Sequence, residues 1–144
     1  MHIRFAAIRT PALLLAAAAS TTLAAPPTVL LSTINGHPTA AIPGLPGEFD
    51  FFNRLHGSPG GTRFIMKTVT DLDTEANDVL IGGLLTPGGA TIEVLGQEGQ
   101  PATFAPDPLE TLGLFDNVAS ILDDGRHAYG NNTKTGSTAS DEYI

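Results

Sequence analysis

Residues 28–39 (TVLLSTINGHPT) and residues 91–102 (TIEVLGQEGQPA) fall into register when the sequence is shifted on itself by 63 positions. The register continues without a gap to Ile81 and Ile144, and ten of the 54 residue pairs are identical. In both copies Gly and Pro stand where turns are expected, and apolar residues stand where strands are expected. The sequence therefore predicts a tandem repeat, and we call its offset of 63 residues the repeat spacing.

Short runs that alternate apolar and polar residues recur outward from these segments. With 16 Gly and 11 Pro, no long window has the apolar spacing of an amphipathic helix. The predicted fold class is all-β, with tandem antiparallel units of about four strands each, which is the make-up of a propeller blade. Closed propellers need about four to eight blades, so the predicted architecture is propeller-blade-like and incomplete. The expected strands are TVLLSTI, EFDFFNRL, TRFIMKTV, DVLIGGLL, TIEVLG, TLGLFDNVASIL and RHAYG.

The N-terminus has the order of a secretory signal peptide. Arg4 and Arg9 precede an apolar Ala/Leu run, and small residues ending at Ala24 close it. A membrane span needs about 20 apolar residues, and this run is shorter. The predicted organisation is a signal peptide at 1–24, a first repeat unit at 25–90 and a shortened second unit at 91–144. We expect the chain to be secreted, at the cell surface or periplasmic, with no transmembrane anchor.

The composition excludes several classes of function. The formal net charge is −8, and no basic patch is present that could bind nucleic acid. The chain has no cysteine, which excludes disulfides, thiolate catalysis and cysteine metal sites. The acidic residues are spread along the chain, as on the solvated surface of an exported protein.

The segment 71–78 (DLDTEAND) is the candidate metal site. Its carboxylates could offer hard oxygen ligands to Ca²⁺. However, Ala76 and Gly82 stand where a calcium loop requires a glycine and a bidentate glutamate. We expect a solvated loop with at most weak Ca²⁺ binding, and no other cofactor. The candidate ligands are Asp71, Asp73, Glu75 and Asp78.

Three other motifs have simpler interpretations than catalysis. The pair Asp124-Gly125 within DDGR predicts a tight turn, because Gly takes positive φ without strain. Ser58 lacks the glycine that a nucleophile elbow requires two residues before it, since His56 stands there. The glycosylation pattern at 131–133 (NNT) is expected on a turn. No catalytic residue is predicted.

The second unit carries a recognisable pattern in residues 93–102 (EVLGQEGQPA) and 114–129 (LFDNVASILDDGRHAY). It resembles the secreted bacterial tandem-repeat proteins whose repeat has an Asn-x-x-Gly-x-x-Ala-Phe signature after a Glu-Gly-x-Pro-Ala turn. Gly125 and Ala128 match this signature, Tyr129 replaces its phenylalanine, and Leu122 stands at the asparagine position. The resemblance implies propeller-like β repeats with secreted or surface placement and no assigned chemistry. The residues that match the upstream turn are Glu98, Gly99, Pro101 and Ala102.

These observations predict an exported, non-catalytic β-repeat segment that serves as a surface or extracellular binding or structural module. Its expected partner is an extracellular ligand, or a second copy through an uncharged edge such as TVLLSTI. Two alternatives stay open. The chain could be a fragment of a secreted hydrolase or carbohydrate-active enzyme that uses the acidic loop residues, or a truncated relic without a stable fold.

Overall fold

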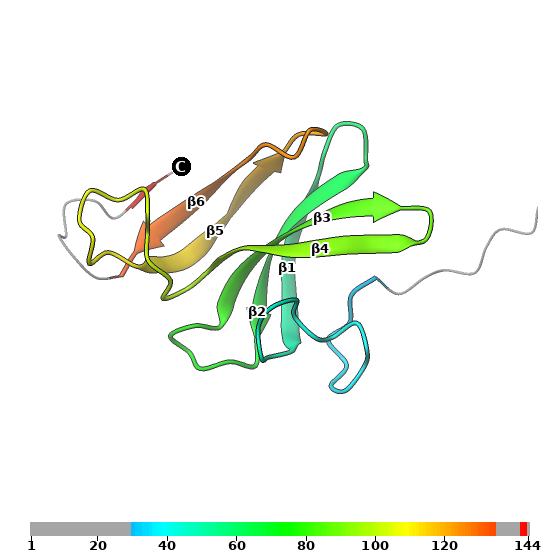
Figure 1. Cartoon of the computed structure of the whole chain (residues 1–144), viewed down its shortest axis with the longest axis horizontal. Coiled ribbons are helices and arrows are strands. Elements are labelled where there is room, and N and C mark those ends of the chain that lie inside the picture. Colours follow the sequence, from blue (N-terminus) through cyan, green and yellow to red (C-terminus); the bar gives the residue numbers. More distant parts are fainter. Residues whose placement is uncertain (1–29, 135–141, 144) are drawn as a thin grey trace, which may run out of the picture.

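The protein is all-β over the residues that the structure describes, 30–134 and 142–143. This computed structural model has seven strands and no helix in those ranges (Figure 1). The predicted fold class is confirmed at this level, whereas the predicted signal peptide at 1–24 lies outside the described residues. The strands are β1 (Phe49–Gly57), β2 (Arg63–Thr70), β3 (Asp78–Thr86), β4 (Gly89–Gln97), β5 (Leu112–Ile121), β6 (His127–Thr133) and β7 (Glu142–Tyr143).

The strands form two antiparallel sheets in chain order. The first sheet is β1-β2-β3-β4 and the second is β5-β6-β7. The second sheet therefore has three strands among the described residues, and two equal propeller blades are not formed there. The predicted unit boundary between residues 90 and 91 falls inside β4, which pairs with β3 in the first sheet.

One predicted strand is absent from both sheets. Within the predicted strand 28–34, the described residues Leu30 to Ile34 belong to no strand. Backbone bonding shows why: the Ser32 amide donates to the Thr39 carbonyl at 3.1 Å, and the Ile34 amide donates to the Ser32 hydroxyl at 3.0 Å. This segment therefore folds onto its own loop instead of joining a sheet.

A second correction concerns the NNT pattern. Asn131 to Thr133 lie in strand β6, not on a turn, and the Asn131 side chain is buried. Its amide nitrogen lies 3.3 Å from the Gly113 carbonyl. An asparagine enclosed in this way is not accessible for modification in the folded protein.

The first sheet is covered on both faces. We call the face that carries Phe64, Met66 and Ile81 the front face, and the opposite face, with Ile65 and Leu80, the back face. β2 and β3 are buried along most of their lengths, which explains why both read as nearly continuous apolar runs.

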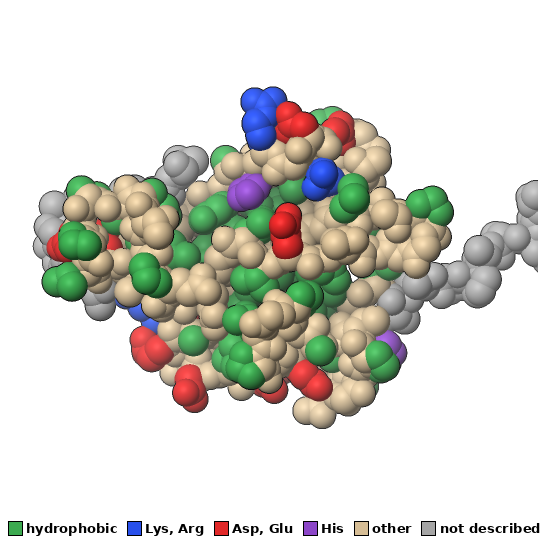
Figure 2. Space-filling model, in the orientation of Figure 1, with side chains coloured by type: hydrophobic (Ala, Val, Ile, Leu, Met, Phe, Trp, Pro, Cys, Tyr) green, Lys and Arg blue, Asp and Glu red, His purple; other side chains and the backbone are tan. Residues whose placement is uncertain are grey.

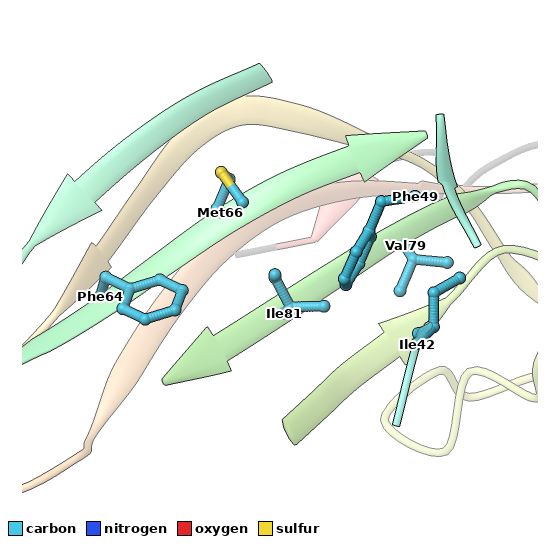
Figure 3. Close-up of a cluster of buried hydrophobic side chains, with 6 residues drawn as sticks. All are labelled: Ile42, Phe49, Phe64, Met66, Val79 and Ile81. Atoms are coloured by element: carbon cyan, nitrogen blue, oxygen red, sulfur yellow. The ribbon is translucent and has the colours of Figure 1, made fainter. Parts of the chain in front are cut away.

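The front face packs against the chain that leads into β1. Ile42 from this segment lies in the cluster, and Leu31 and Leu45 pack against its margin. Figure 3 shows the side chains converging over β2 and β3. The buried members are Ile42, Phe49, Phe64, Met66, Val79 and Ile81.

The back face packs against the second sheet. Ile65 and Leu80 meet Phe115, which is fully buried, and Tyr129 lies edge-on to the Phe115 ring at 5.6 Å between centroids. The two sheets lie closest where β5 passes β1 and β2 (Figure 1). This second core, completed by Ala102, Leu112 and Ile121, joins the sheets into one body.

The hairpins β1–β2 and β5–β6 share their register at the repeat spacing in the part that lies away from the turn. β1 and β5, which are the first strands of their sheets, each contain two register shifts. The pairs formed by Phe49 and Phe52 in β1 match those formed by Leu112 and Phe115 in β5. Nearer the turn, β5 has one more residue than β1 in its second bulge, so Ala119, not Val118, takes the place of Leu55. The matching pairs are Phe49–Thr70 with Leu112–Thr133, and Phe52–Thr68 with Phe115–Asn131.

Candidate functional site

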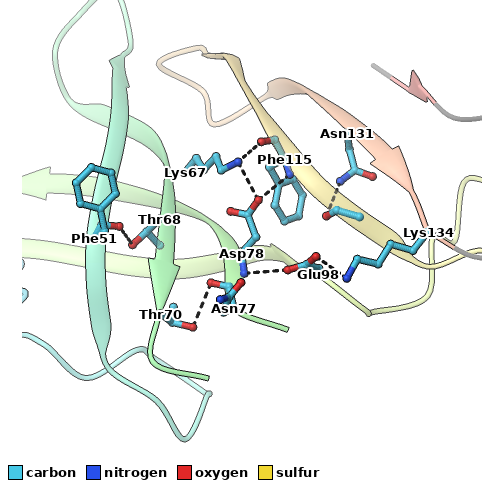
Figure 4. A network of polar contacts seen from close by, with 11 residues as sticks. Phe51, Lys67, Thr68, Thr70, Asn77, Asp78, Glu98, Phe115, Asn131 and Lys134 are labelled. Carbon is cyan, nitrogen blue, oxygen red and sulfur yellow. Dashed lines mark hydrogen bonds and ion pairs between the residues drawn. The ribbon is translucent and has the colours of Figure 1, made fainter. Parts of the chain in front are cut away.

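The two sheets are locked together by a buried ion pair. Lys67 projects from the back face of β2, and its Nζ lies 2.9 Å from Oδ2 of Asp78. The Asp78 side chain is only 2% exposed. The same oxygen accepts the Phe115 amide of β5 at 3.0 Å, and Lys67 donates to the Phe115 carbonyl (Figure 4). One lysine and one aspartate therefore bind both polar groups of a single residue across the junction.

The junction makes Asp78 hard to ionise. Burial raises its pKa, the nearby charge of Glu98 adds to this rise, and the bonds from Lys67 and the Phe115 amide oppose it. Oδ1 of Asp78 has no hydrogen-bond partner among the described residues. A buried carboxylate with an unpaired oxygen is costly, and its position is best explained by the fixed orientation that it imposes on the second sheet.

A second ion cluster closes the same junction from the loop after β6. Lys134 Nζ lies 2.6 Å from Glu98 Oε1 and 2.7 Å from Glu75 Oε2. Glu98 is buried, and its other oxygen lies 3.3 Å from the Asp78 amide. The hydrogen bonds that Lys134 donates to both carboxylates raise its pKa, and the bond to Glu75 lowers the pKa of that carboxyl group. Each charge is thus held by a structural partner.

The structure does not bring the four predicted calcium ligands together. Asp71 accepts the Glu48 amide at 2.7 Å, and the Asp73 carbonyl accepts the Ala76 amide. Glu75 and Asp78 are engaged by different lysines. Over residues 30–134 and 142–143, no three His, Asp or Glu side chains are arranged to hold a metal ion.

The motif DDGR forms the turn between β5 and β6, as predicted. Gly125 has φ of +93° and its amide donates to the Leu122 carbonyl, as the Gly61 amide with φ of +69° donates to the Ser58 carbonyl in the β1–β2 turn. Asp124 stays within its own turn, where it accepts the Arg126 amide and Nε.

Asp123 joins this turn to the preceding one. Its carboxylate oxygens accept the Gly60 amide at 3.0 and 3.1 Å, and its carbonyl accepts Arg63 Nε at 3.0 Å. The hydrogen bond from the Ser58 hydroxyl is the largest cause that lowers the pKa of Asp123. Hydrogen bonds from the Gly60 amide and the Thr62 hydroxyl lower it further. The turns therefore clasp each other side by side, as the upper part of Figure 1 shows.

The remaining candidates have no catalytic geometry among the described residues. Ser58 is buried, and its hydroxyl accepts the Arg63 amide at 3.1 Å. His56 Nε2 lies 3.2 Å from the Asn117 carbonyl oxygen, and His37 Nδ1 lies 3.0 Å from the Thr39 hydroxyl. His56 and Ser58 therefore contact different partners and do not form a nucleophile–base pair.

Apolar side chains are exposed on the strands that begin each sheet. Phe51 and Leu55 on β1 are 57% and 60% exposed, and Leu114 and Val118 on β5 are 52% and 72% exposed. The members of each pair, Phe51 with Leu114 and Leu55 with Val118, stand one repeat spacing apart. We call these four residues the first-strand strip. Figure 2 shows that apolar side chains also gather in the middle of one face of the molecule, with acidic side chains mainly at its margins.

Sequence reasoning missed the junction. Lys67 is a single charge inside the apolar strand RFIMKTV, and Asp78 begins the apolar strand DVLIGG. A lone charge in a strand buried on both faces needs a partner of opposite charge. This requirement indicated that Lys67 is paired inside the protein. The strip carried a signal too, because its residues are apolar at the same positions of both units.

No family model, curated protein or solved structure matches this chain. In the part of the chain that the structure describes, no helix is long and apolar enough to cross a membrane. The function is therefore inferred from the residues of the chain itself.

Proposed function

We propose that the protein is an exported, non-catalytic β-repeat module that acts by contact, as a surface or extracellular binding or structural element. The first-strand strip is its contact surface. The observation that carries the proposal is the recurrence of exposed apolar residues on β1 and β5 at sequence positions that lie one repeat spacing apart. Single exposed apolar residues are ordinary, but packing gives no reason for the same exposed positions to recur in two units.

The finer architecture is part of this proposal. Each sequence unit would give its first strand to the preceding sheet and its next three strands to a sheet of its own. β4 supports this arrangement because it begins the second sequence unit yet pairs with β3 along eight residue pairs. The common register of the two hairpins supports it as well.

The use of the polar residues supports a non-catalytic role. Asp78, Lys67 and Asp123 each bind backbone groups across the sheet junction or between turns. Catalytic carboxylates must be free to exchange protons with a substrate. These side chains are instead hydrogen-bonded in contacts that hold the two sheets together.

Binding of the uncharged dye Nile red tests the strip, because a neutral probe is not repelled by the acidic chain. We expect the fluorescence of the bound dye to fall by more than half in the double variant Phe51→Ser/Leu114→Ser. The matched control is Leu109→Ser, an exposed leucine whose counterpart one repeat spacing earlier is Pro46. Unchanged fluorescence in the double variant, with the β signal in circular dichroism retained, would refute the strip as a contact surface.

A further inference from the structure

We infer that Lys67 and Asp78 are placed to join through an amide bond between their side chains, as a cross-link from β2 to β3 beneath the second sheet. The bond bridges the loop at 71–77, so a cut in that loop leaves the two strands joined. It gives a covalent brace to a chain that has no cysteine and therefore forms no disulfide. This modification is separate from the proposed contact function, because neither residue belongs to the first-strand strip.

The fold places the two side chains next to each other on the back face. Asp78 lies opposite Val69, two positions along β2 from Lys67. Lys67 and Asp78 are therefore diagonal neighbours on adjacent strands, which lie about 7–8 Å apart and are within reach of a long side chain. Nζ of Lys67 accordingly lies 2.9 Å from Oδ2 of Asp78 (Figure 4). Holding two reacting groups together in this way makes their reaction a step within one molecule.

The two side chains are also largely removed from water. The Lys67 side chain is only 16% exposed, and the Asp78 side chain is buried against Phe115. Burial disfavours charged forms, so it favours transfer of a proton from the ammonium to the carboxylate, which leaves an amine and a carboxylic acid. In keeping with this, burial raises the pKa of Asp78. A desolvated lysine amine is a nucleophile, and the carboxyl group of Asp78 is the group within its reach.

The bond forms by condensation and needs no other reactant. The Lys67 nitrogen attacks Cγ of Asp78, a C–N bond forms, the bond from Cγ to Oδ1 breaks, and Oδ1 leaves as water. Of the three protons of the ammonium, two leave with this water and one stays on the amide nitrogen. Nothing is oxidised or reduced. One neutral amide replaces two buried charges, which removes the cost of keeping both ions out of water.

The hydrogen bonds of the junction fit the amide better than they fit the ion pair. Oδ2 of Asp78 accepts the Phe115 amide at 3.0 Å, whereas Oδ1 has no partner among the described residues. The departure of Oδ1 therefore breaks no hydrogen bond there and removes a buried, unsatisfied acceptor. The amide keeps Oδ2 to accept the Phe115 amide, and its N–H is the donor that the Phe115 carbonyl needs. Both polar atoms of the cross-link are then bonded to one residue.

The other lysine of the junction does not meet these conditions. Nζ of Lys134 is shared between Glu98 and Glu75. Both oxygens of Glu98 are engaged, Oε1 by Lys134 and Oε2 by the Asp78 amide. Neither oxygen can leave as water without the loss of a contact. We therefore expect Lys134 to keep its free amine.

The bond forms after folding, and it forms slowly. Among the described residues, Lys67 is the only one whose side chain is hydrogen-bonded to the Asp78 carboxyl group. No general acid or base is therefore in place to speed the proton transfers. Fresh protein holds mainly the ion pair, and the amide accumulates on storage. The stability and the titration of the ion pair are properties of the fresh, open form, because the amide has neither charge.

The intact mass of the folded protein tests this modification. Protein purified in its folded state is stored for several weeks near neutral pH and compared with fresh protein by mass spectrometry. We expect more than half of the stored molecules to be lighter by the mass of one water molecule. After denaturation, trypsin locates the change, because it releases residues 64–67 (FIMK) only where the Lys67 amine is free. The yield of this peptide should fall by more than half on storage, whereas residues 127–134 (HAYGNNTK), which end at Lys134, should be released equally from both samples.

Two variants separate this bond from other routes to the same mass. Lys67→Arg keeps a positive charge beside Asp78 but offers no amine, so the loss of water should disappear. Asp124→Ala is the matched control. The pair Asp124-Gly125 could also lose water, by closing a ring on its own backbone, and we expect the loss to persist in this variant.

Stored wild-type protein that keeps its full mass would overturn the inference. So would a loss of water that leaves the yield of residues 64–67 unchanged, or one that persists in Lys67→Arg. The wild-type masses decide the question even if Lys67→Arg does not fold. The Nile red result stands independently, because that test changes residues of the first-strand strip and not this pair.

Discussion

Lys67 and Asp78 show how one pair of side chains can decide the placement of a whole sheet. Lys67 would leave a charge stranded among Ile65, Leu80 and Phe115 if Asp78 were absent, and the reverse is also true. Replacing both partners with apolar residues can be neutral, whereas removing one leaves an uncompensated charge. The pair therefore acts mainly by fixing the position of the second sheet against the first.

Truncation of the lysine tests this constraint. We expect Lys67→Ala to lower the free energy of unfolding by about 3 kcal/mol, because Asp78 is left buried and unpaired. Arg126→Ala removes the partner of Asp124 in an exposed ion pair and should cost less than about 1 kcal/mol. Urea denaturation measures both, and equal losses would show that the junction carries no special weight.

The pH dependence of stability tests the state of Asp78. Its pKa in the folded protein lies above the unfolded value of 3.8, so the folded state holds the proton more tightly. The stability contributed by this group is fully present below pH 3.8 and is lost as pH rises through the folded pKa.

The wild type should therefore lose stability relative to Asp78→Asn as the pH rises from 3.8. Glu75 and Asp123 have lowered pKa values and contribute in the opposite direction, but both remain in the variant and cancel in the difference. Urea denaturation of the two proteins across this range gives the slope. A wild type that gains relative stability with rising pH would contradict the assignment.

Close packing sets the third residue-scale test. A Cβ at Gly83 would overlap the Phe64 ring, whereas a Cβ at Gly88 would meet nothing within 4 Å. We expect Gly83→Ala to cost about 1–3 kcal/mol through overpacking, and Gly88→Ala to be nearly neutral. Thermal unfolding of the two variants compares them directly, and similar midpoints would show that the front face is more loosely packed than described.

At the scale of elements, local patterns predicted the strands and turns but not their partners. The alternation in EFDFFNRL predicts a strand and the Asp-Gly pair in DDGR predicts a turn, and both patterns depend only on neighbouring residues. The structure has a strand and a turn at these places. Leu30 to Ile34 have the composition of a strand but are not paired, because strand formation needs a ladder partner that composition does not specify. Asn131 was misplaced for the same reason, since its strand is extended by pairing with Leu112 to Phe115.

The clasp between the two turns predicts a local change in exchange. Asp123→Ala removes the acceptor of the Gly60 amide, so the exchange of that amide with deuterium should become several-fold faster. Asp124→Ala is the matched control, because Asp124 bonds only within its own turn among the described residues. Equal effects of the two variants at Gly60 would mean that the turns are not joined.

At the scale of the whole molecule, the candidate site depends on contacts between distant segments. The first-strand strip could have been found from the sequence, because its residues recur at a fixed spacing. For the junction, the sequence could show that Lys67 needs a partner but not which one, because Lys67, Asp78 and Phe115 meet only when the second sheet stacks on the back face of the first. The four acidic residues that the sequence grouped as calcium ligands have different partners in the fold.

The central claim is that the two hairpins are equivalent at the repeat spacing, and interstrand nuclear Overhauser effects between backbone protons test it most directly. We predict close contacts for Phe49–Thr70 and Phe52–Thr68, and the corresponding contacts for Leu112–Thr133 and Phe115–Asn131. Nearer the turn, Ala119 should contact Tyr129 as Leu55 contacts Met66. A β5–β6 register displaced by one or more residues at Leu112 or Phe115 would contradict the repeat.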